Sequence, residues 1–516
     1  MNRRSLLKGL AATGVVAQLM PHVGIKAFAH ALPRRGLLRT AAGNKNAMVI
    51  LRLYGGNDGL NTLVPVHDEN YYRFRHRGTN RNVSILPEET LLLPDHATLG
   101  LHPSLALLHE LYQEGKMAAV QNVGYPNQDL SHFRSTDIWL TGSDAWTFET
   151  SGWYGRYLED QFPDSLNALP SYPFAIEMGP FMSAALMGRK GPMGFALNDL
   201  HYLPAPTSNS TGVTLPAEIE TEYVRLIARQ SHQFIGALME ANTKTTEPTV
   251  EYPSHPPLAT ELSTIAKLID VGVETSVWLV TMPGFDTHHH QLPDHAARLA
   301  EIGRCIHTFQ RDLESRGLAD RVCLMVISEF GRRVESQGLG TDHGAAAPVM
   351  VVGNGVQPGI IGPDPDLVNL DENNNLRFQY DFRQIYSSLM CQWLGAEPES
   401  LVPNVFERTF AQVPIFKGAQ VGLPIAAPLA TSPAVQLEGI WPNPARSTAE
   451  ISIRGANGRS DLTVECWSQH GQLLLRQAVP ANGILQLNVL GWPTGSYMLR
   501  LHGDEVEQSQ KFGVVR

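Results

Sequence analysis

Five short segments place carboxylates, imidazoles, a hydroxyl or a guanidinium directly beside runs of apolar residues. They are residues 55–59 with Asp58, 131–133 with Ser131, 284–290 with Asp286 and His288, 328–332 with Arg332, and 340–344 with Asp342 and His343. Aspartate and histidine together form the ligand set of zinc and other divalent ions in sites that keep an open position. If one fold brings these segments together, they predict a metal site.

The apolar runs beside these segments are short, unbroken and separated by helical patterns. Such runs are typical of strands buried on both faces of a sheet. They cover residues 48–54, 117–123, 276–282, 322–327 and 349–352, and helical spacing of apolar residues covers 258–269, 294–316 and 381–394. The alternation predicts an α/β domain over residues 45–418, with a mostly parallel sheet and helices on both faces.

The order of strands and polar segments supports a common site. Four polar segments follow a predicted strand, and residues 340–344 come immediately before the fifth. Ligands of such sheets bind beyond the carboxyl ends of the strands, so we expect these side chains to meet at one edge. We favour a metal site, because independent turns would not all place ligand chemistry at the same edge.

Each polar residue also has a structural alternative. Asp58 between glycines is a common turn former, and Ser131 could cap the helix that follows it. Residues 288–290 could form a solvated loop in which at most one or two histidines bind metal. The pair Asp342-His343 could be a turn aspartate beside a buried histidine.

Composition excludes several classes of function. The 516 residues suggest about three units of roughly 150 residues each. With 40 basic and 50 acidic residues the formal net charge is −10, which argues against a nucleic-acid-binding surface. No apolar run approaches the roughly 18 residues of a membrane-spanning helix. The four cysteines are too few for a disulfide scaffold or a cysteine-rich zinc site.

The N-terminal residues 1–29 have the pattern of a signal peptide. Arg3 and Arg4 form a twin-arginine pattern, a weakly apolar stretch follows over residues 9–20, and Ala27-Phe28-Ala29 offers small residues for cleavage before His30. An amphipathic helix of the mature protein is the alternative. The twin-arginine translocase exports folded proteins, often already loaded with a cofactor, so we expect an exported protein that passes through the periplasm.

The C-terminal part changes character after a linker over residues 419–438. Apolar residues then alternate in short runs, which predicts a small β-sandwich over residues 439–516. Trp441-Pro442-Asn443-Pro444, a turn at Gly471, residues 495–499 and residues 511–515 resemble the C-terminal sorting domain of the type IX secretion system. That resemblance implies the type IX machinery as a partner and release to the cell surface or medium. A carbohydrate-binding or general interaction sandwich is the alternative.

The middle of the chain also resembles a known family. The matching segments are residues 53–62, 101–103, 131–133, 151–153, 285–288, 328–332 and 340–344, in the family's order. They are similar to a large uncharacterised family of twin-arginine-exported proteins, a domain of unknown function allied to the alkaline phosphatase and sulfatase superfamily. The resemblance implies a metal-dependent hydrolase of phosphate or sulfate esters that holds two ions.

The resemblance also implies roles for individual residues. Asp58 would be the ligand after the first strand, Asp342 and His343 the Asp-His pair, and Asp286 with His288 (or His290) the ligands of the second ion. Ser131 would be the nucleophile, and Arg332 would bind the equatorial oxygens of the transferred group. Zinc is the favoured ion, with calcium, magnesium and manganese as alternatives.

Two departures from the superfamily pattern keep a second function open. The chain has neither Cys-x-Pro-x-Arg nor Ser-x-Pro-x-Arg, one of which a sulfatase needs for its formylglycine. The surroundings of Ser131 also differ from those of a phosphatase nucleophile. The alternative is a non-catalytic, secreted glycan-binding or surface protein on the same scaffold.

Overall fold

A computed structural model describes residues 44–75, 83–165, 168–200, 218–419, 435–454, 456, 461–468, 472–480, 482–503 and 506–515. The predicted signal peptide, the cleavage position before His30, most of the linker and the turn at Gly471 lie outside these residues. The described residues divide into two compact units. The first unit contains residues 44–142 and 149–419, and the second contains residues 143–148 and 435–515.

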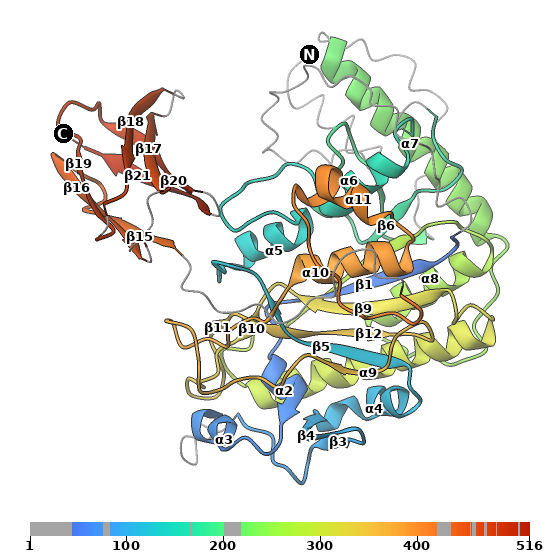
Figure 1. Cartoon of the computed structure of the whole chain (residues 1–516). Coiled ribbons are helices and arrows are strands. Elements are labelled where there is room, and N and C mark those ends of the chain that lie inside the picture. Colours follow the sequence, from blue (N-terminus) through green and yellow to red (C-terminus); the bar gives the residue numbers. More distant parts are fainter. Residues whose placement is uncertain are drawn as a thin grey trace. The chain divides into compact units, whose positions relative to one another are not determined.

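A nine-stranded sheet forms the centre of the first unit (Figure 1). Its order is β13-β5-β12-β9-β1-β8-β6-β7, and β14 also pairs with β5. The strands are β1 (Ala47–Tyr54), β5 (Met117–Gly124), β6 (Ala175–Met178), β7 (Phe195–Leu197), β8 (Val277–Pro283), β9 (Val322–Ser328), β12 (Ala347–Val352), β13 (Gly359–Ile361) and β14 (Tyr380–Asp381). Every residue of β5 and β9 is buried, as continuous apolar runs predict for a covered sheet.

The direction of one strand differs from the sequence prediction. β1 pairs in parallel with β8 and β9, but β12, the predicted fifth parallel strand, runs antiparallel to both β9 and β5. The start of β12 therefore lies at the edge where β1, β8 and β9 end. This direction explains how residues 340–344, which precede β12, reach the same edge as the other polar segments.

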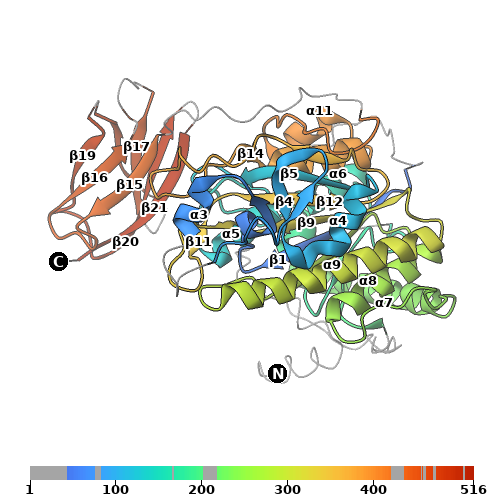
Figure 2. The ribbon, with the colours of Figure 1, turned by 90° about the horizontal axis from the view of Figure 1, so that it is seen from below.

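Helices cover both faces of this sheet. Figure 1 shows α5 (His132–Thr141), α6 (Trp153–Gln161) and α10 (Phe382–Ser388) on one side, and α4 (Ala106–Gln113) and α9 (Gln291–Ser315) on the other. α8 (Pro257–Asp270) packs against α9 in both views (Figures 1 and 2). Val49, Leu51 and Leu53 of β1 share one core with α4, α8 and α9. The mixed α/β architecture predicted from the sequence is confirmed.

The remaining elements complete the first unit. They are α2 (Gly59–Thr62), β2 (Leu63–Pro65), α3 (Glu69–Arg75), β3 (Leu91–Leu93), β4 (His96–Leu101), η2 (Pro103–Leu105), η3 (Ala184–Leu186), α7 (Glu218–Asn242), β10 (Gly331–Arg332), β11 (His343–Gly344), η5 (Leu389–Trp393), α11 (Pro398–Leu401) and η6 (Val402–Phe406). The predicted helix over residues 381–394 is α10 followed by the π-helical turn η5. No helix in the described part of the chain is both long enough and apolar enough to span a bilayer.

The second unit consists of two antiparallel sheets. One has the order β15-β16-β19 and the other β18-β17-β20-β21. The strands are β15 (Gln436–Trp441), β16 (Thr448–Arg454), β17 (Thr463–Ser468), β18 (Leu473–Ala478), β19 (Ile484–Asn488), β20 (Gly495–Gly503) and β21 (Val506–Val514). Ile451, Val464 and Leu499, from both sheets, share one core, as the predicted β-sandwich requires. β15 begins inside the predicted linker.

Glu261 of α8 makes the stability of the first unit depend on pH. Burial raises the pKa of Glu261 from its ordinary value of 4.5 to about 7. The folded chain holds a proton there that the unfolded chain releases, so the stability from this group is complete below pH 4.5 and is lost as pH rises towards 7. We expect Glu261→Gln to raise the free energy of unfolding at pH 8 by about 1–3 kcal/mol.

Denaturant unfolding of both proteins at pH 4.5 and pH 8 measures this effect. The gain is expected at pH 8 and should vanish near pH 4.5, where the wild-type carboxyl is also largely protonated in the folded state. Glu251→Gln, at an exposed glutamate, is the matched control and should change neither value. An equal gain at both pH values would show that charge burial is not the cause.

Candidate metal site

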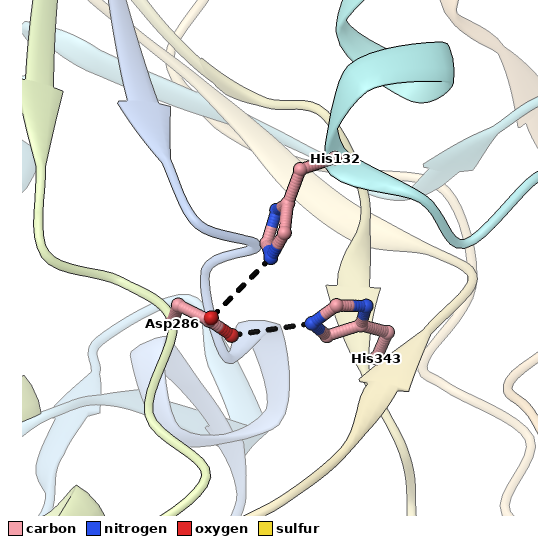
Figure 3. Close-up of side chains that lie close together, drawn as sticks. All are labelled: His132, Asp286 and His343. Atoms are coloured by element: carbon pink, nitrogen blue, oxygen red, sulfur yellow. Dashed lines mark hydrogen bonds and ion pairs between the residues drawn. The ribbon is translucent and has the colours of Figure 1, made fainter.

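Three segments meet at the edge where β1, β8 and β9 end. Asp286 and His288 lie in the loop after β8, His343 begins β11, and His132 begins α5. Figure 3 shows the side chains of His132 and His343 pointing towards the carboxylate of Asp286. Glycine permits this approach at Gly55 (φ 125°), because a Cβ atom there would lie 2.3 Å from the backbone nitrogen of Asp286.

We call His132, Asp286, His288 and His343 the metal cluster. Three of their side-chain atoms form a small triangle at its centre. His288 Nε2 lies 2.9 Å from Asp286 Oδ1 and 3.1 Å from His343 Nε2, and the third side of the triangle, His343 Nε2 to Asp286 Oδ1, is 3.2 Å. Ligand atoms around a tetrahedral zinc ion with bonds of about 2.0–2.1 Å lie about 3.3 Å apart. The triangle therefore has nearly the dimensions of one face of such a site.

A hydrogen bond from His343 to the backbone fixes which of its ring nitrogens faces the triangle. Its Nδ1 lies 2.7 Å from the carbonyl oxygen of Leu130, which can only accept a hydrogen bond. Nδ1 therefore donates to this carbonyl, and Nε2 is the ring nitrogen that faces His288 and Asp286. A backbone carbonyl that fixes the tautomer in this way is the usual partner of a metal-binding histidine.

His132 is oriented in the same manner by a buried carboxylate. Its Nδ1 lies 3.0 Å from Glu329 Oε1, which also accepts a hydrogen bond from the backbone nitrogen of Gly55 at 2.7 Å. His132 Nε2 is buried without a hydrogen bond and lies 3.4 Å from Asp286 Oδ2. The rings of Tyr54 and Phe330 pack against His132, with centres 5.6 Å and 4.9 Å away.

Charge at Asp286 is compensated by an arginine behind the cluster. Burial would raise the pKa of Asp286, but the hydrogen bond and charge of Arg332, at 2.6 Å, hold it at about 2. Burial lowers the pKa of His288, against the pull of the Asp286 carboxylate. Both shifts favour an ionised carboxylate beside a neutral imidazole, which are the protonation states that bind metal.

The residues of the cluster fit a divalent ion. Ligand atoms of His132, Asp286 and His343 lie within 4.8 Å of one another, and the same holds for His288, Asp342 and His343. A buried imidazole nitrogen without a hydrogen bond, here His132 Nε2, is an unsatisfied group for which a cation would provide a partner. Imidazole and carboxylate ligands suit zinc, with manganese or iron as further ions that accept this set.

Asp342 lies at the margin of the cluster. Its Oδ1 accepts a hydrogen bond from the backbone nitrogen of His343 at 2.8 Å and lies 3.7 Å from His288 Nδ1. His288 is thus placed between two carboxylates, with Nε2 towards Asp286 and Nδ1 towards Asp342. The structure places Asp342 beside the ring nitrogen of His288 that faces away from the triangle.

Asp58 is not brought into the cluster. Its carboxylate is fully buried and forms an ion pair with Arg75 of α3, and it also accepts a hydrogen bond from Gln291 at the start of α9. Burial would raise the pKa of Asp58, but the charge and hydrogen bond of Arg75 lower it overall. Gln291 Oε1 in turn accepts a hydrogen bond from Thr341 Oγ1 at 2.6 Å. Asp58 therefore supports the loop that carries Asp342 and His343.

The two residues nominated for catalysis occupy different positions. Ser131 is exposed at the N-cap of α5, and its side chain makes no capping hydrogen bond. Arg332 is buried, and its N–H groups reach the carbonyl oxygens of Gly55, Gly56, Phe285 and Thr341 as well as Asp286. Ser131 is thus accessible to a substrate, whereas Arg332 is directed at protein oxygens.

Two residues of the site were missed by the sequence reasoning. His132 follows Ser131 directly at the start of a helix, and its sequence position did not distinguish a metal ligand from an ordinary helix residue. Glu329 lies within the segment 328–332, but a carboxylate one residue after a buried strand does not reveal which imidazole it meets. His290, the alternative ligand to His288, is instead the N-cap of α9 with φ 51°.

Comparison with known proteins gives two family matches and several distant structural likenesses. Residues 237–412 match a family described as a protein of unknown function (DUF1501), and residues 439–515 match the secretion system C-terminal sorting domain. No curated protein matches the chain.

The structural likenesses are weak. A protein in the alkaline phosphatase superfamily from Vibrio parahaemolyticus is 11% identical, with a TM-score of 0.34, over 99% of this chain and 90% of its own. The PsFucS1 sulfatase from Pseudoalteromonas sp. is 11% identical, with a TM-score of 0.33, over 89% of this chain and 84% of its own. A biofilm associated protein is 14% identical, with a TM-score of 0.13, over 16% of this chain and 14% of its own.

The two family matches confirm the resemblances inferred from the motifs of residues 285–344 and from the Trp441-Pro442-Asn443-Pro444 segment. The sorting domain implies the type IX secretion machinery and indicates secretion or display at the cell surface. The chain thus contains a segment that matches DUF1501, a family of unknown function, followed by a segment that matches the secretion system C-terminal sorting domain.

Proposed function

We propose that this protein is an exported, metal-dependent hydrolase of phosphate or sulfate esters. The observation that carries the proposal is the triangle of Asp286 Oδ1, His288 Nε2 and His343 Nε2, with sides of 2.9–3.2 Å. Nδ1 of His343 donates to the carbonyl of Leu130, so that Nε2 faces the triangle, and His132 Nε2 lies beside the triangle without a hydrogen bond. An open-sided Asp/His cluster at the carboxyl edge of a sheet is suited to holding an ion that also contacts substrate.

His132, Asp286, His288 and His343 would hold the ion. When bound, a divalent ion neutralises charge on a phosphoryl or sulfuryl group and lowers the pKa of a nearby hydroxyl. Glu329 orients His132 from behind, and the carbonyl of Leu130 orients His343. A second ion beside Asp342 and His288 would complete the two-ion arrangement expected from the resemblance.

Ser131 is the proposed nucleophile because of its neighbours. Leu130 before it contacts His343, and His132 after it is itself a member of the cluster. Its hydroxyl is exposed and uncommitted at the N-terminus of a ten-residue helix, where the helix dipole favours negative charge. Transfer of the phosphoryl or sulfuryl group to Ser131 Oγ releases the alcohol, and water then releases phosphate or sulfate.

Arg332 has a positioning role in this proposal. Its guanidinium is fully buried and joins the ends of β1, the loop after β8 and the loop before β11. These contacts hold Asp286 in place and leave the binding of ester oxygens to other groups. The role expected from the resemblance, contact with the equatorial oxygens, would require Arg332 to break these bonds.

Export completes the proposal. A twin-arginine signal over residues 1–29 would carry the folded domain, with its ion bound, into the periplasm, where cleavage leaves His30 at the new N-terminus. The sorting domain over residues 439–516 would then direct it through the type IX machinery.

The first experiment measures bound metal in the mature chain from His30, by elemental mass spectrometry without chelator. We expect about one or two equivalents of a divalent ion, zinc above all, and ion-dependent turnover of 4-nitrophenyl phosphate or 4-nitrophenyl sulfate. Protein that stays metal-free after equilibration with zinc, calcium, magnesium and manganese, and inactive on both esters, would overturn the proposal in favour of a binding protein.

A further inference from the structure

A small cavity lies on the face of the sheet covered by α5, α6 and α10. Its volume is about 20 Å³, and Arg52 of β1, Glu177 of β6 and Thr281 of β8 line it together with Trp153 and Tyr386. Arg52 and Thr281 are register partners on neighbouring strands. A cavity of this size accommodates one water molecule or one hydroxyl group, which needs about 10–15 Å³.

Arg52 brings unpaired donors to this cavity. Its Nε and Nη1 atoms are buried and make no hydrogen bond. Its guanidinium carbon lies 5.6 Å from the ring centre of Tyr54, a contact that holds the side chain but satisfies no N–H group. Buried N–H groups of a cation without an acceptor are unfavourable, so an oxygen atom placed beside them would be bound.

Glu177 brings an acceptor to the same cavity. It is 8% exposed, and its Oε2 accepts a hydrogen bond from the backbone nitrogen of Ser183 at 2.6 Å. Burial raises the pKa of Glu177, and the charge of Arg52 acts in the opposite direction. Among the described residues no ion pair or hydrogen bond joins Glu177 to Arg52. The two groups line the cavity from different strands, β6 and β1.

The two groups together select one ligand chemistry. An oxygen that accepts from Arg52 and donates to Glu177 must carry a hydrogen, which a hydroxyl does and a fully ionised sulfate or phosphate oxygen does not. The complement of this cavity is therefore a neutral hydroxyl, from water or from an alcohol or sugar.

Strand β1 links the cavity to the metal cluster. Arg52 precedes Tyr54 by two residues on β1, so the two side chains share one face of the sheet and are about 7 Å apart along the strand. The ring of Tyr54 packs against His132. Arg52, Tyr54 and His132 therefore form a continuous row of contacts between the cavity and the cluster.

We propose that the cavity between Arg52 and Glu177 is a subsite for one hydroxyl group of a sugar or other polyol, occupied by water when the ligand is absent. The inference deepens the proposed function, on which its kinetic test rests, because it makes the alcohol part of the ester a hydroxylated ring. Binding of the sugar itself does not depend on turnover.

Two measurements on the full mature chain test the subsite. The first is calorimetric binding of glycerol and of the methyl glycosides of glucose, galactose and fucose. We expect saturable binding of at least one glycoside, weakened about tenfold or more in Arg52→Met and in Glu177→Gln. Arg73→Met, which removes an exposed arginine over the ring of Phe74, is the matched control and should bind like wild type.

The second measurement is hydrolysis of sugar phosphates or sugar sulfates beside the 4-nitrophenyl esters. Arg52→Met is expected to raise KM about tenfold or more for the sugar esters, while kcat and all constants for the 4-nitrophenyl esters stay near wild type. The melting temperature should change little, because Nε and Nη1 of Arg52 make no hydrogen bond in the fold.

The outcomes separate this inference from the proposed hydrolase. Glycoside binding that depends on Arg52, in a protein that hydrolyses no ester, would support the subsite and refute the hydrolase. Ester hydrolysis in which Arg52→Met changes neither KM nor glycoside binding, or changes both ester series equally, would refute the subsite alone. No glycoside or glycerol binding by wild type would show that the cavity takes water only, and would also refute it.

Discussion

Asp286→Asn is expected to remove bound metal from the purified protein and to abolish ester hydrolysis. Asp286 is the carboxylate that lies within 2.9–3.4 Å of three imidazole nitrogens, those of His288, His343 and His132. The amide keeps the size and the hydrogen bond of the side chain but loses its negative charge and basicity towards a cation. Loss of affinity should exceed the roughly 10- to 100-fold typical of an outer partner of a ligand.

Asp342→Asn provides the matched comparison. Asp342 lies beside Nδ1 of His288, outside the triangle, so we expect its amide variant to weaken metal binding about 10- to 100-fold and to remain active at saturating ion. Elemental mass spectrometry and titration of activity with zinc measure both effects. Equal, complete loss of metal in both variants would make Asp342 a ligand of the first ion; full retention in Asp286→Asn would refute the triangle as the site.

Asp58→Asn is expected to destabilise the first unit by about 3–5 kcal/mol without changing its ability to bind metal. Removing the carboxylate leaves the guanidinium of Arg75 buried, with no counter-charge in its ion pair. Arg75 also donates to the carbonyl oxygens of Val334 and Arg333, and these bonds remain in the folded variant and hold the segment that leads to the cluster. Denaturant unfolding gives the free energy, and elemental analysis gives the metal content.

A double-mutant cycle with Arg75→Met separates the pair from the rest of the core. The combined variant should be more stable than either single variant, because neither charge then remains buried alone. Metal titration of each folded variant completes the test. Loss of metal in Asp58→Asn at unchanged stability would contradict this view and restore the ligand role that the superfamily resemblance implies for Asp58.

Most of the first unit could be predicted because its strands are continuous apolar runs and its helices have regular spacing. The predicted strand over residues 322–327 differs from β9 by one residue, and helix 258–269 differs from α8 by one residue at each end. α9 starts at Gln291, three residues before the predicted start. Gln291 is a polar residue and so was not read as part of the helix, but its side chain is buried and donates a hydrogen bond to Asp58.

The direction of β12 could not be predicted from its composition. A strand buried on both faces has the same apolar run whether its neighbours are parallel or antiparallel. The connection from Ser328 to Ala347 contains the antiparallel pair β10–β11, which turns the chain back at the same edge. A parallel strand would have needed a crossover of a dozen or more residues, usually a helix, to return to the opposite edge.

The sequence pointed to members of the candidate site that lie close together in the chain. It did not reveal contacts between residues that are distant in sequence. Asp286 and His288 lie two residues apart in one loop, and His343 joins them through the turn before β12. The partner that neutralises Asp58 is Arg75 on α3, and nothing in the spacing of Asp58 distinguishes a buried ion pair from a metal ligand. Likewise, the contact of His132 with Glu329 spans 197 residues and follows only from the order of the strands.

The contacts of Arg332 affect how the protein is assembled. One guanidinium fastens the end of β1, the loop carrying Asp286 and the loop carrying Thr341, and it does so through backbone oxygens that are present before any ion arrives. The cluster is therefore preorganised: the carboxylate already has a counter-charge, and the apo chain can fold to its final shape. Under the proposed function, metal loading would be a late step, separable from folding, and the folded protein would take up or exchange its ion in any compartment that it crosses.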